Sequence, residues 1–247
     1  MRRLGQSYAS PHDLKQLPAA LLRTAPPRLG VASEPLAAGD DGIAQTVEVM
    51  TRLAQGAEGA QNPYVRMLAL DITRGLGARD YYGQIEAIYD WVKQNIEFRG
   101  EFSETVQSPL VTLQMGAGDC DCQATLVAAL LGAQGIATRP VTVAADAEDP
   151  ETFTHVYLEA FDRGANQWVP LDTTVPSASP GWAPERVYRR REWPAMSGLA
   201  GLGDAQSDGA LLIQDVAAPL AQGAAAALAN RSNSASFGLN FGSTSNF

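Results

Sequence analysis

Apolar residues recur at helical spacing through the first half of the chain, from about residue 43 to about residue 134. Residues three and four positions apart share one face of a helix, so this spacing predicts amphipathic helices. We expect helices over residues 43–55, from Asn62 onward, from about Tyr81 to Ile96, and from Cys120 to about Gln134. The spacing of the second helix continues as far as Leu76.

Short polar residues mark where several of these helices begin. Asn62 and Ser108 each precede a proline, and Asp119 precedes the helix that starts at Cys120. Such side chains accept hydrogen bonds from the free N–H groups of a first turn, where proline also fits. Gly135 suits the left-handed conformation that ends many helices, so the last helix should stop there.

The pattern changes after Gly135. Residues 138–144, 154–161 and 167–171 are rich in β-branched and aromatic residues and are separated by turn residues, which predicts three strands. After Asp172, repeated prolines exclude long regular elements: Pro176, Pro180, Pro184 and Pro194. Helices followed by antiparallel strands predict a domain of the α+β class.

The two ends of the chain have a different composition. Residues 1–42 are rich in Pro, Ala and Gly without a steady period, and we expect a flexible arm. Residues 43–194 should form the domain, and residues 195–247 a tail rich in Gly, Ala, Ser and Asn. The apolar stretch 210–229 contains Asp215 and Pro219, which favours a docking helix over a membrane span. The aromatic residues of 234–247 fit either disorder or a strand docked on a partner.

Charge and cysteine content narrow the class of protein. Lys and Arg number 18 and Asp and Glu 27, so the net charge of −9 argues against nucleic acid as the main partner. The basic run of Arg186, Arg189, Arg190 and Arg191 should be solvated or paired with carboxylates. The early arginines are followed by no apolar stretch, so we expect no secretory signal. The two cysteines are one residue apart, too close for an unstrained disulfide, which predicts a reducing cytoplasm.

Three residues could form a catalytic triad. Cys120 begins its helix, where free amide groups and the helix dipole favour a thiolate. Because the other histidine, His12, lies in the expected arm, His155 is the histidine of the folded part. His155 opens one strand and Asp172 follows the next, so antiparallel pairing would set them side by side. A thiol, an imidazole and an orienting carboxylate are the parts of nucleophilic catalysis.

At these residues the sequence resembles the transglutaminase-like family. The first block is a Gly-x-Cys with a small residue four positions later, then Gly-Ile-x-x-Arg: Gly118, Cys120, Ala124, Gly135, Ile136 and Arg139. The second is His155 with Glu159 four positions later, and the third runs from Trp168 through Leu171-Asp172 to Thr174. The resemblance covers roughly residues 80–194. Residues 91–101 and 107–113 are also similar to copies in tailed phages and prophages.

The resemblance implies a papain-like, transglutaminase-core fold with the catalytic residues Cys120, His155 and Asp172. It selects Cys120 over Cys122, which stands where the family usually has an acidic residue. Cys122 is then a small buried residue or a second reactive thiol. The Cys120 N–H is one oxyanion donor by position. Gln114 has the spacing of the second donor, and it is either that donor or an accidental match. Asp119 and Asp121 would oppose the thiolate unless solvent screens them.

These residues support three functional hypotheses. The first is thiol-dependent acyl transfer on peptide-like amides, with hydrolysis favoured over cross-linking, a protein or peptide substrate and no cofactor. The second is a structural or assembly protein of a phage, cytoplasmic or virion-associated, which binds phage structural proteins through the tail. The third is zinc or redox binding by Asp119, Cys120, Cys122 and His155, although this spacing falls short of a paired Cys-x-x-Cys.

Overall fold

Helices lead and strands follow in the computed structural model, which describes residues 37–100 and 105–197. The helices are α2 (Asp40–Gln55), α3 (Pro63–Ile72), α4 (Tyr81–Asn95), α5 (Pro109–Met115) and α6 (Cys120–Ala133). Two short strands, β1 (Glu97–Phe98) and β2 (Ala117–Gly118), lie among them, and β3 (Thr138–Ala144), β4 (His155–Asp162), β5 (Gln167–Leu171) and β6 (Arg189–Glu192) come last. Most of the expected arm and tail lies outside the described residues.

The expected start signals act as caps. The side chain of Asn62 accepts from the Tyr64 N–H, that of Ser108 from the Val111 N–H, and that of Asp119 from the Cys122 N–H. Gly135 has a φ of +75°, the left-handed conformation expected after α6. The expected continuation of the second helix to Leu76 is wrong. That helix ends at Ile72, and Leu76 lies 39% exposed beyond the turn.

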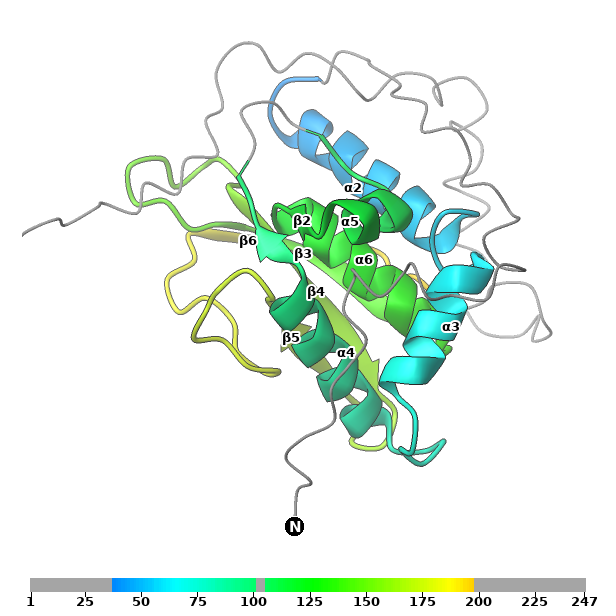
Figure 1. Cartoon of the computed structure of the whole chain (residues 1–247). Helices are drawn as coiled ribbons and strands as arrows, with labels where there is room; N and C mark the ends of the chain where they lie inside the picture. The colour runs from blue at the N-terminus through cyan, green and yellow to red at the C-terminus, as the bar shows by residue number, and fades with distance from the viewer. Residues whose placement is uncertain (1–36, 101–104, 198–247) are drawn as a thin grey trace, which may run out of the picture.

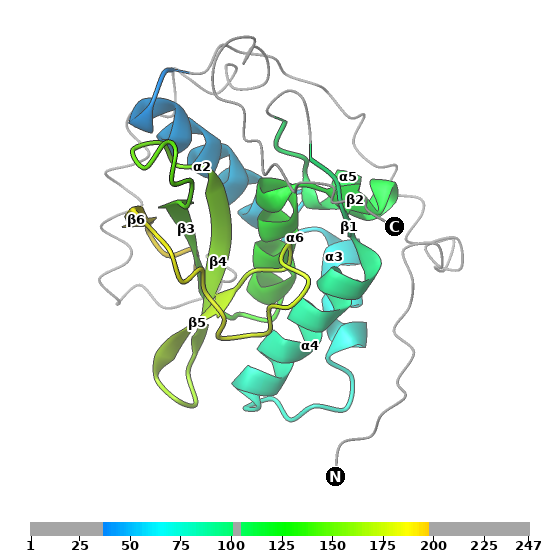
Figure 2. The ribbon, with the colours of Figure 1, turned by 90° about the vertical axis from the view of Figure 1, so that its left-hand side faces the viewer.

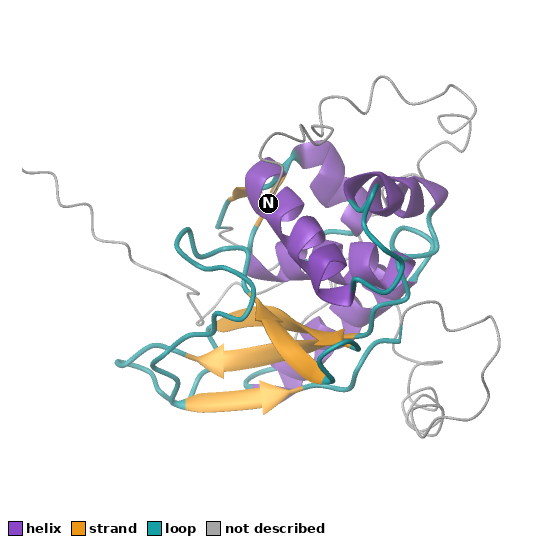
Figure 3. Ribbon diagram, turned by 90° about the horizontal axis from the view of Figure 1, so that it is seen from below, coloured by secondary structure: helices purple, strands orange, loops and turns teal. Residues whose placement is uncertain are grey.

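The last four strands form one antiparallel sheet in the order β5-β4-β3-β6. The helices gather on one side of this sheet, as Figure 3 shows from below. The described strands and helices therefore form two layers (Figure 1), the α+β arrangement that the order of elements predicted.

Helix α6 is the centre of the structure. It contacts α2, α3, α4 and α5 as well as β3 and β4, and Figure 2 shows it between the sheet and α4. Every residue from Asp121 to Gly132 is buried, including the polar Asp121, Gln123 and Thr125, so this helix has no solvent-facing polar side over that stretch. Leu126, Leu130 and Leu131 are fully buried there against Leu158 of β4 and other core residues.

The other face of the sheet is covered by the segment after β5. Val141, Val143 and Tyr157 form a second small cluster with Ala183 and Val187 of this segment. Alternate residues of a strand point to opposite faces. Val156, Leu158 and Ala160 of β4 accordingly belong to the core on the helix side.

Strand β6 carries most of the basic run. Arg189 pairs with Asp40 at 2.7 Å, and Arg190 pairs with Glu159 at 2.6 Å. The guanidinium of Arg191 lies 3.8 Å from the centre of the Trp193 ring. The interpretation of this run as carboxylate-paired is confirmed for Arg189 and Arg190, and this charge serves to hold the edge strand.

Candidate active site

Cys120 is the first residue of α6 and is partly exposed. A loop of four residues joins α6 to β3, so the helix and the strand run in opposite directions. Helix α6 has 14 residues, about 21 Å, and β3 has seven, about 23 Å, so the two elements are similar in length. The start of α6 therefore lies toward the end of the sheet where β3 finishes.

His155 lies at that same end. It is the first residue of β4 and is paired in register with Val143, the last residue but one of β3. Its side chain is 10% exposed. The imidazole shares a sheet face with Tyr157, the two ring centres being 6.3 Å apart, and this face is the one that the segment after β5 covers.

Asp172 follows β5 directly and meets His155 as the strand pairing predicted. His155 Nε2 lies 2.7 Å from Asp172 Oδ2. The other carboxylate oxygen, Oδ1, accepts from the Thr174 N–H at 3.0 Å and from the Thr174 hydroxyl at 2.7 Å. Both oxygens are thus engaged, which fixes the orientation of the carboxylate.

The hydrogen bonds to Asp172 also favour its charged form. Its side chain is 1% exposed, and such burial alone would raise the pKa of the carboxyl group. The bonds from His155 and Thr174 and the charge of His155 together outweigh burial, so the pKa of Asp172 lies below its ordinary value. A charged carboxylate is what an orienting group for an imidazole requires.

The backbone of Asp172 is held by α4. The hydroxyl of Tyr89 donates to the Asp172 carbonyl oxygen at 2.8 Å, and Lys93 Nζ donates to the Tyr89 oxygen at 3.2 Å. The sequence pattern did not indicate these two residues. Their four-residue spacing places them on one face of a helix, but that spacing alone does not show that this face meets the turn after Asp172.

Cys122 is buried, as the first of its two interpretations predicted. Its side chain is 0% exposed, and its sulfur accepts from the Gln107 N–H at 3.3 Å and donates to the Thr105 carbonyl at 3.4 Å. Burial, and the carboxylates of Asp121 and Asp119, raise the pKa of the Cys122 thiol far above its ordinary value. Cys122 therefore remains a neutral thiol that ties residues 105–107 to α6.

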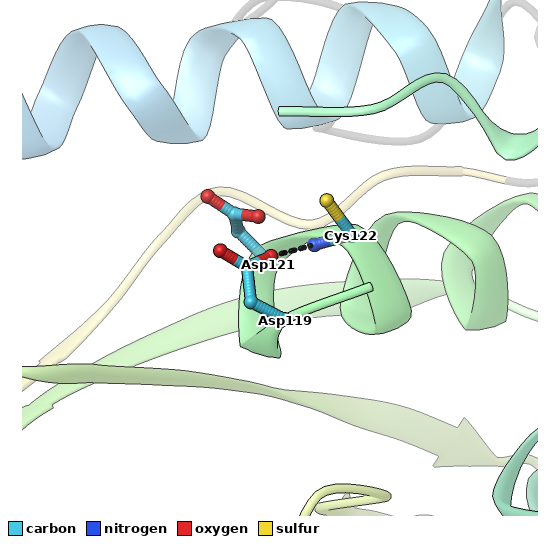
Figure 4. A group of neighbouring side chains, drawn as sticks. All are labelled: Asp119, Asp121 and Cys122. Atoms are coloured by element: carbon cyan, nitrogen blue, oxygen red, sulfur yellow. Dashed lines mark hydrogen bonds between the residues drawn. The ribbon is translucent and has the colours of Figure 1, made fainter. Parts of the chain in front are cut away.

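The acidic residues beside Cys120 differ from each other. Asp119 is partly exposed and caps α6 through the Cys122 N–H at 3.2 Å, whereas Asp121 is only 4% exposed. Their carboxylate oxygens and the Cys122 sulfur lie within 4.8 Å of one another, and Figure 4 shows the group at the first turn of α6. Solvent therefore screens Asp119 more than it screens Asp121.

This group differs from the zinc set expected from the sequence. Of that set only Asp119 and Cys122 belong to it, and Asp121 takes part instead of Cys120 and His155. Two carboxylates and one thiol are fewer protein ligands than the four of a structural zinc site. The zinc hypothesis stays untested.

Gln114 lies in the last turn of α5 and is exposed. Its role as an oxyanion donor stays a prediction. A second glutamine, Gln123, is 1% exposed in α6 and donates from its amide to the Gly118 carbonyl at 3.2 Å. This bond fixes the residue that stands two positions before Cys120.

Gly118 also packs closely against α6. A Cβ atom at this position would lie 2.6 Å from the Cβ of Cys122 and 3.5 Å from a methyl group of Thr112. The Gly118 carbonyl accepts from the Arg99 N–H at 3.1 Å, beside the pairing of β1 with β2. The glycine of the Gly-x-Cys block is therefore required by close packing.

Comparison with known proteins supports the expected fold class. Residues 66–173, which carry Cys120, His155 and Asp172, match the family model described as the transglutaminase-like superfamily. No curated protein matches the chain. The expected α+β class, with helices packed on a small antiparallel sheet, is confirmed. The likeness to phage and prophage copies stays a prediction.

Three solved structures are similar at low identity. A candidate cysteine protease from Cytophaga hutchinsonii is 22% identical with a TM-score of 0.41, and the match covers 74% of this chain and 65% of that one. A candidate protease from Parabacteroides distasonis ATCC 8503 is 15% identical, with a TM-score of 0.38 and coverage of 55% and 31%. Legionella pneumophila LapG is 17% identical, with a TM-score of 0.40 and coverage of 69% and 94%. The chain thus spans less than two thirds of the first two proteins.

Within the described residues, every helix is too short or too polar to cross a membrane. The apolar stretch 210–229 lies outside those residues.

Proposed function

We propose that this protein catalyses thiol-dependent acyl transfer on peptide-like amides, with Cys120 as nucleophile, His155 as general acid and base, and Asp172 as orienting carboxylate. The observation that carries the proposal is the 2.7 Å hydrogen bond between His155 Nε2 and Asp172 Oδ2. It lies in the segment that matches the transglutaminase-like family model, at the end of the sheet toward which α6 begins.

The tautomer of the imidazole follows from this hydrogen bond. A carboxylate is only an acceptor, so Nε2 carries the proton and donates it to Asp172. In the neutral ring Nδ1 is then the basic nitrogen that would take the proton of the Cys120 thiol. Because His155 opens β4, the thiol would reach its ring past the end of the sheet.

The proposed reaction has two halves. The Cys120 sulfur attacks the carbonyl carbon, and the carbonyl oxygen takes up negative charge beside the Cys120 N–H and, in this proposal, the Gln114 amide. The C–N bond breaks, the amine leaves with the proton from His155, and a thioester remains. Water then attacks the thioester as His155 accepts its proton, and the carboxylic acid and the free thiol are released.

The proposed substrate is a protein or peptide, since its amide bonds release an amine as the leaving group. The proposed acceptor of the acyl group is water. An amine acceptor would give cross-linking instead. Incubation of a fluorescent peptide pool with and without a labelled alkyl amine separates the two fates. Release of new amino termini is expected, and incorporation of the labelled amine in place of hydrolysis would contradict the preference for water.

Alkylation of the thiol tests the catalytic assignment directly. Iodoacetamide should label Cys120 at pH 6–7 at least about tenfold faster than a free cysteine, since a paired imidazole lowers the pKa of a thiol and enriches the thiolate. His155→Ala should abolish the enhancement, and Cys120→Ser should abolish the label. Cys122→Ala is the matched control that keeps it. Ordinary reactivity of Cys120, or reactivity independent of His155, would exclude the triad.

A further inference from the structure

Helix α4 supplies two polar side chains to the turn that follows Asp172. The ammonium group of Lys93 donates to the Val175 carbonyl at 2.9 Å, to the Ala178 carbonyl, and to the Tyr89 oxygen at 3.2 Å. An ammonium group has three N–H donors, so these contacts engage all of them. The turn itself is closed by the bond from the Ala178 N–H to the Val175 carbonyl at 3.1 Å.

Tyr89 extends this contact to Asp172. The Tyr89 side chain is buried with 1% exposure, and its hydroxyl donates to the Asp172 carbonyl at 2.8 Å. Burial and the charges of Asp172 and Asp90 raise the pKa of Tyr89, so the hydroxyl stays a donor at working pH. Burial lowers the pKa of Lys93 while the same two carboxylates act the other way.

The contacts form a continuous series from α4 to the imidazole. Lys93 bonds Tyr89, Tyr89 bonds the backbone of Asp172, and the Asp172 carboxylate bonds His155. Thr174, which directly precedes the Val175 carbonyl that Lys93 binds, supplies both bonds to the second carboxylate oxygen. Displacing the turn from α4 would therefore move both the backbone and the carboxylate of Asp172.

We propose that Tyr89 and Lys93 are positioning residues of the active site, which hold Asp172 at the distance that fixes the tautomer of His155. This inference rests on the proposed function for its catalytic meaning, but its geometric part concerns only Asp172 and His155. Lys93 is suited to the task because one compact cation can bond three oxygen atoms of the turn and of Tyr89.

¹⁵N NMR of the His155 imidazole tests the inference without an active thiol. The chain has two histidines, so His12→Gln leaves His155 as the only one in a ¹⁵N-histidine sample. In this background Tyr89→Phe and Lys93→Met are compared with Gln94→Met, an exposed neighbour on the same helix. The ring should be mainly Nε2–H in the parent and in Gln94→Met, and a mixture of tautomers in the other two.

Alkylation of Cys120 supplies the catalytic readout. Its rate at pH 6 should fall about tenfold in Tyr89→Phe and Lys93→Met and stay within twofold in Gln94→Met, because small displacements of a catalytic group cost large rate factors. If Lys93→Met does not fold, Tyr89→Phe decides, since it removes a single oxygen atom.

Folded Tyr89→Phe protein with the parental tautomer and the parental alkylation rate would overturn the inference. The proposed function fails separately, if the parent itself shows no enhanced alkylation, and the tautomer measurement still decides the inference in that case.

Discussion

The two cysteines at the start of α6 have opposite environments although only one residue separates them. Cys120 is partly exposed at the first helical position, whereas Cys122 is buried and hydrogen-bonded on both sides by residues 105 and 107. Successive helical residues point in different directions, so a nucleophile and a packing residue can be close neighbours. The difference follows from direction on the helix, because the two side chains have the same chemistry.

This difference predicts selective thiol chemistry. A disulfide reagent such as Ellman's reagent should titrate one thiol in the native protein and two after denaturation, because the raised pKa and the burial of Cys122 both prevent attack by its sulfur. The single native equivalent should disappear in Cys120→Ser and remain in Cys122→Ala. Two thiols reacting at equal rates in the folded protein would contradict the structure.

The lowered pKa of Asp172 predicts a dependence of stability on pH. A carboxyl group whose pKa is lower in the folded than in the unfolded chain stabilises the fold above the unfolded value, near 3.8, and loses this effect as pH falls toward the folded value. Asp172→Asn should therefore lower the free energy of unfolding most at pH 5–7 and progressively less below about pH 4. Urea unfolding of both proteins across this range measures the difference in the free energy of unfolding. A difference that stays constant with pH would contradict the prediction.

At the scale of elements, a buried carboxylate joins three strands. Glu159 of β4 is 6% exposed in its side chain and pairs with Arg139 of β3 at 2.6 Å and with Arg190 of β6 at 2.6 Å. The Arg139 guanidinium also lies 4.4 Å from the centre of the Trp168 ring of β5. The charged side chains thus connect all four strands on the face opposite the helices.

Glu159→Ala should destabilise the sheet by about 2 kcal/mol, because Arg139 and Arg190 lose the buried one of the two carboxylates that they share and keep only the more exposed Glu192. The matched control is Asp71→Ala, which removes the partner of Arg74 in an exposed pair and should cost less than about 1 kcal/mol. Urea unfolding measures both values. Equal losses in the two variants would show that Glu159 contributes no more than a surface charge.

At the scale of the whole molecule, local signals predicted elements better than they predicted contacts. Asn62, Ser108 and Asp119 cap helices as expected, because a cap depends on residues within one turn. Two of the three expected strands match their observed limits, and the third is shifted by one residue, starting at His155. Leu76 misled the helix prediction, because its apolar spacing continues past the point where the chain turns.

Contacts between distant segments were harder to predict. The strand pairing that unites His155 with Asp172 was predictable, since adjacent antiparallel strands leave few alternatives. The bond from Tyr89 to Asp172 spans 83 residues, and the pairing of Glu97 with Ala117 joins two-residue strands. Such contacts depend on how α4 and β1 pack in three dimensions, and no local pattern records that.

A chain shortened to residues 37–197 should fold cooperatively. Within the described residues, the core cluster around α6 extends from Val47 of α2 to Met196 beyond β6. We expect the thermal midpoint to change by less than about 4 °C, which corresponds to about 1 kcal/mol for a domain of this size. Differential scanning calorimetry of the full and shortened chains decides this, and a larger decrease would show that the removed ends stabilise the core.

Gly118 limits which sequences this fold accepts around Cys120. Since an added Cβ would come within 2.6 Å of the Cβ of Cys122, position 118 cannot gain even a methyl group while position 122 keeps any side chain. A redesigned protein that keeps this backbone unshifted therefore needs glycine at position 118 as long as position 122 carries a side chain. A replacement at 118 would have to move the first turn of α6, and it would carry the proposed nucleophile out of register with its base.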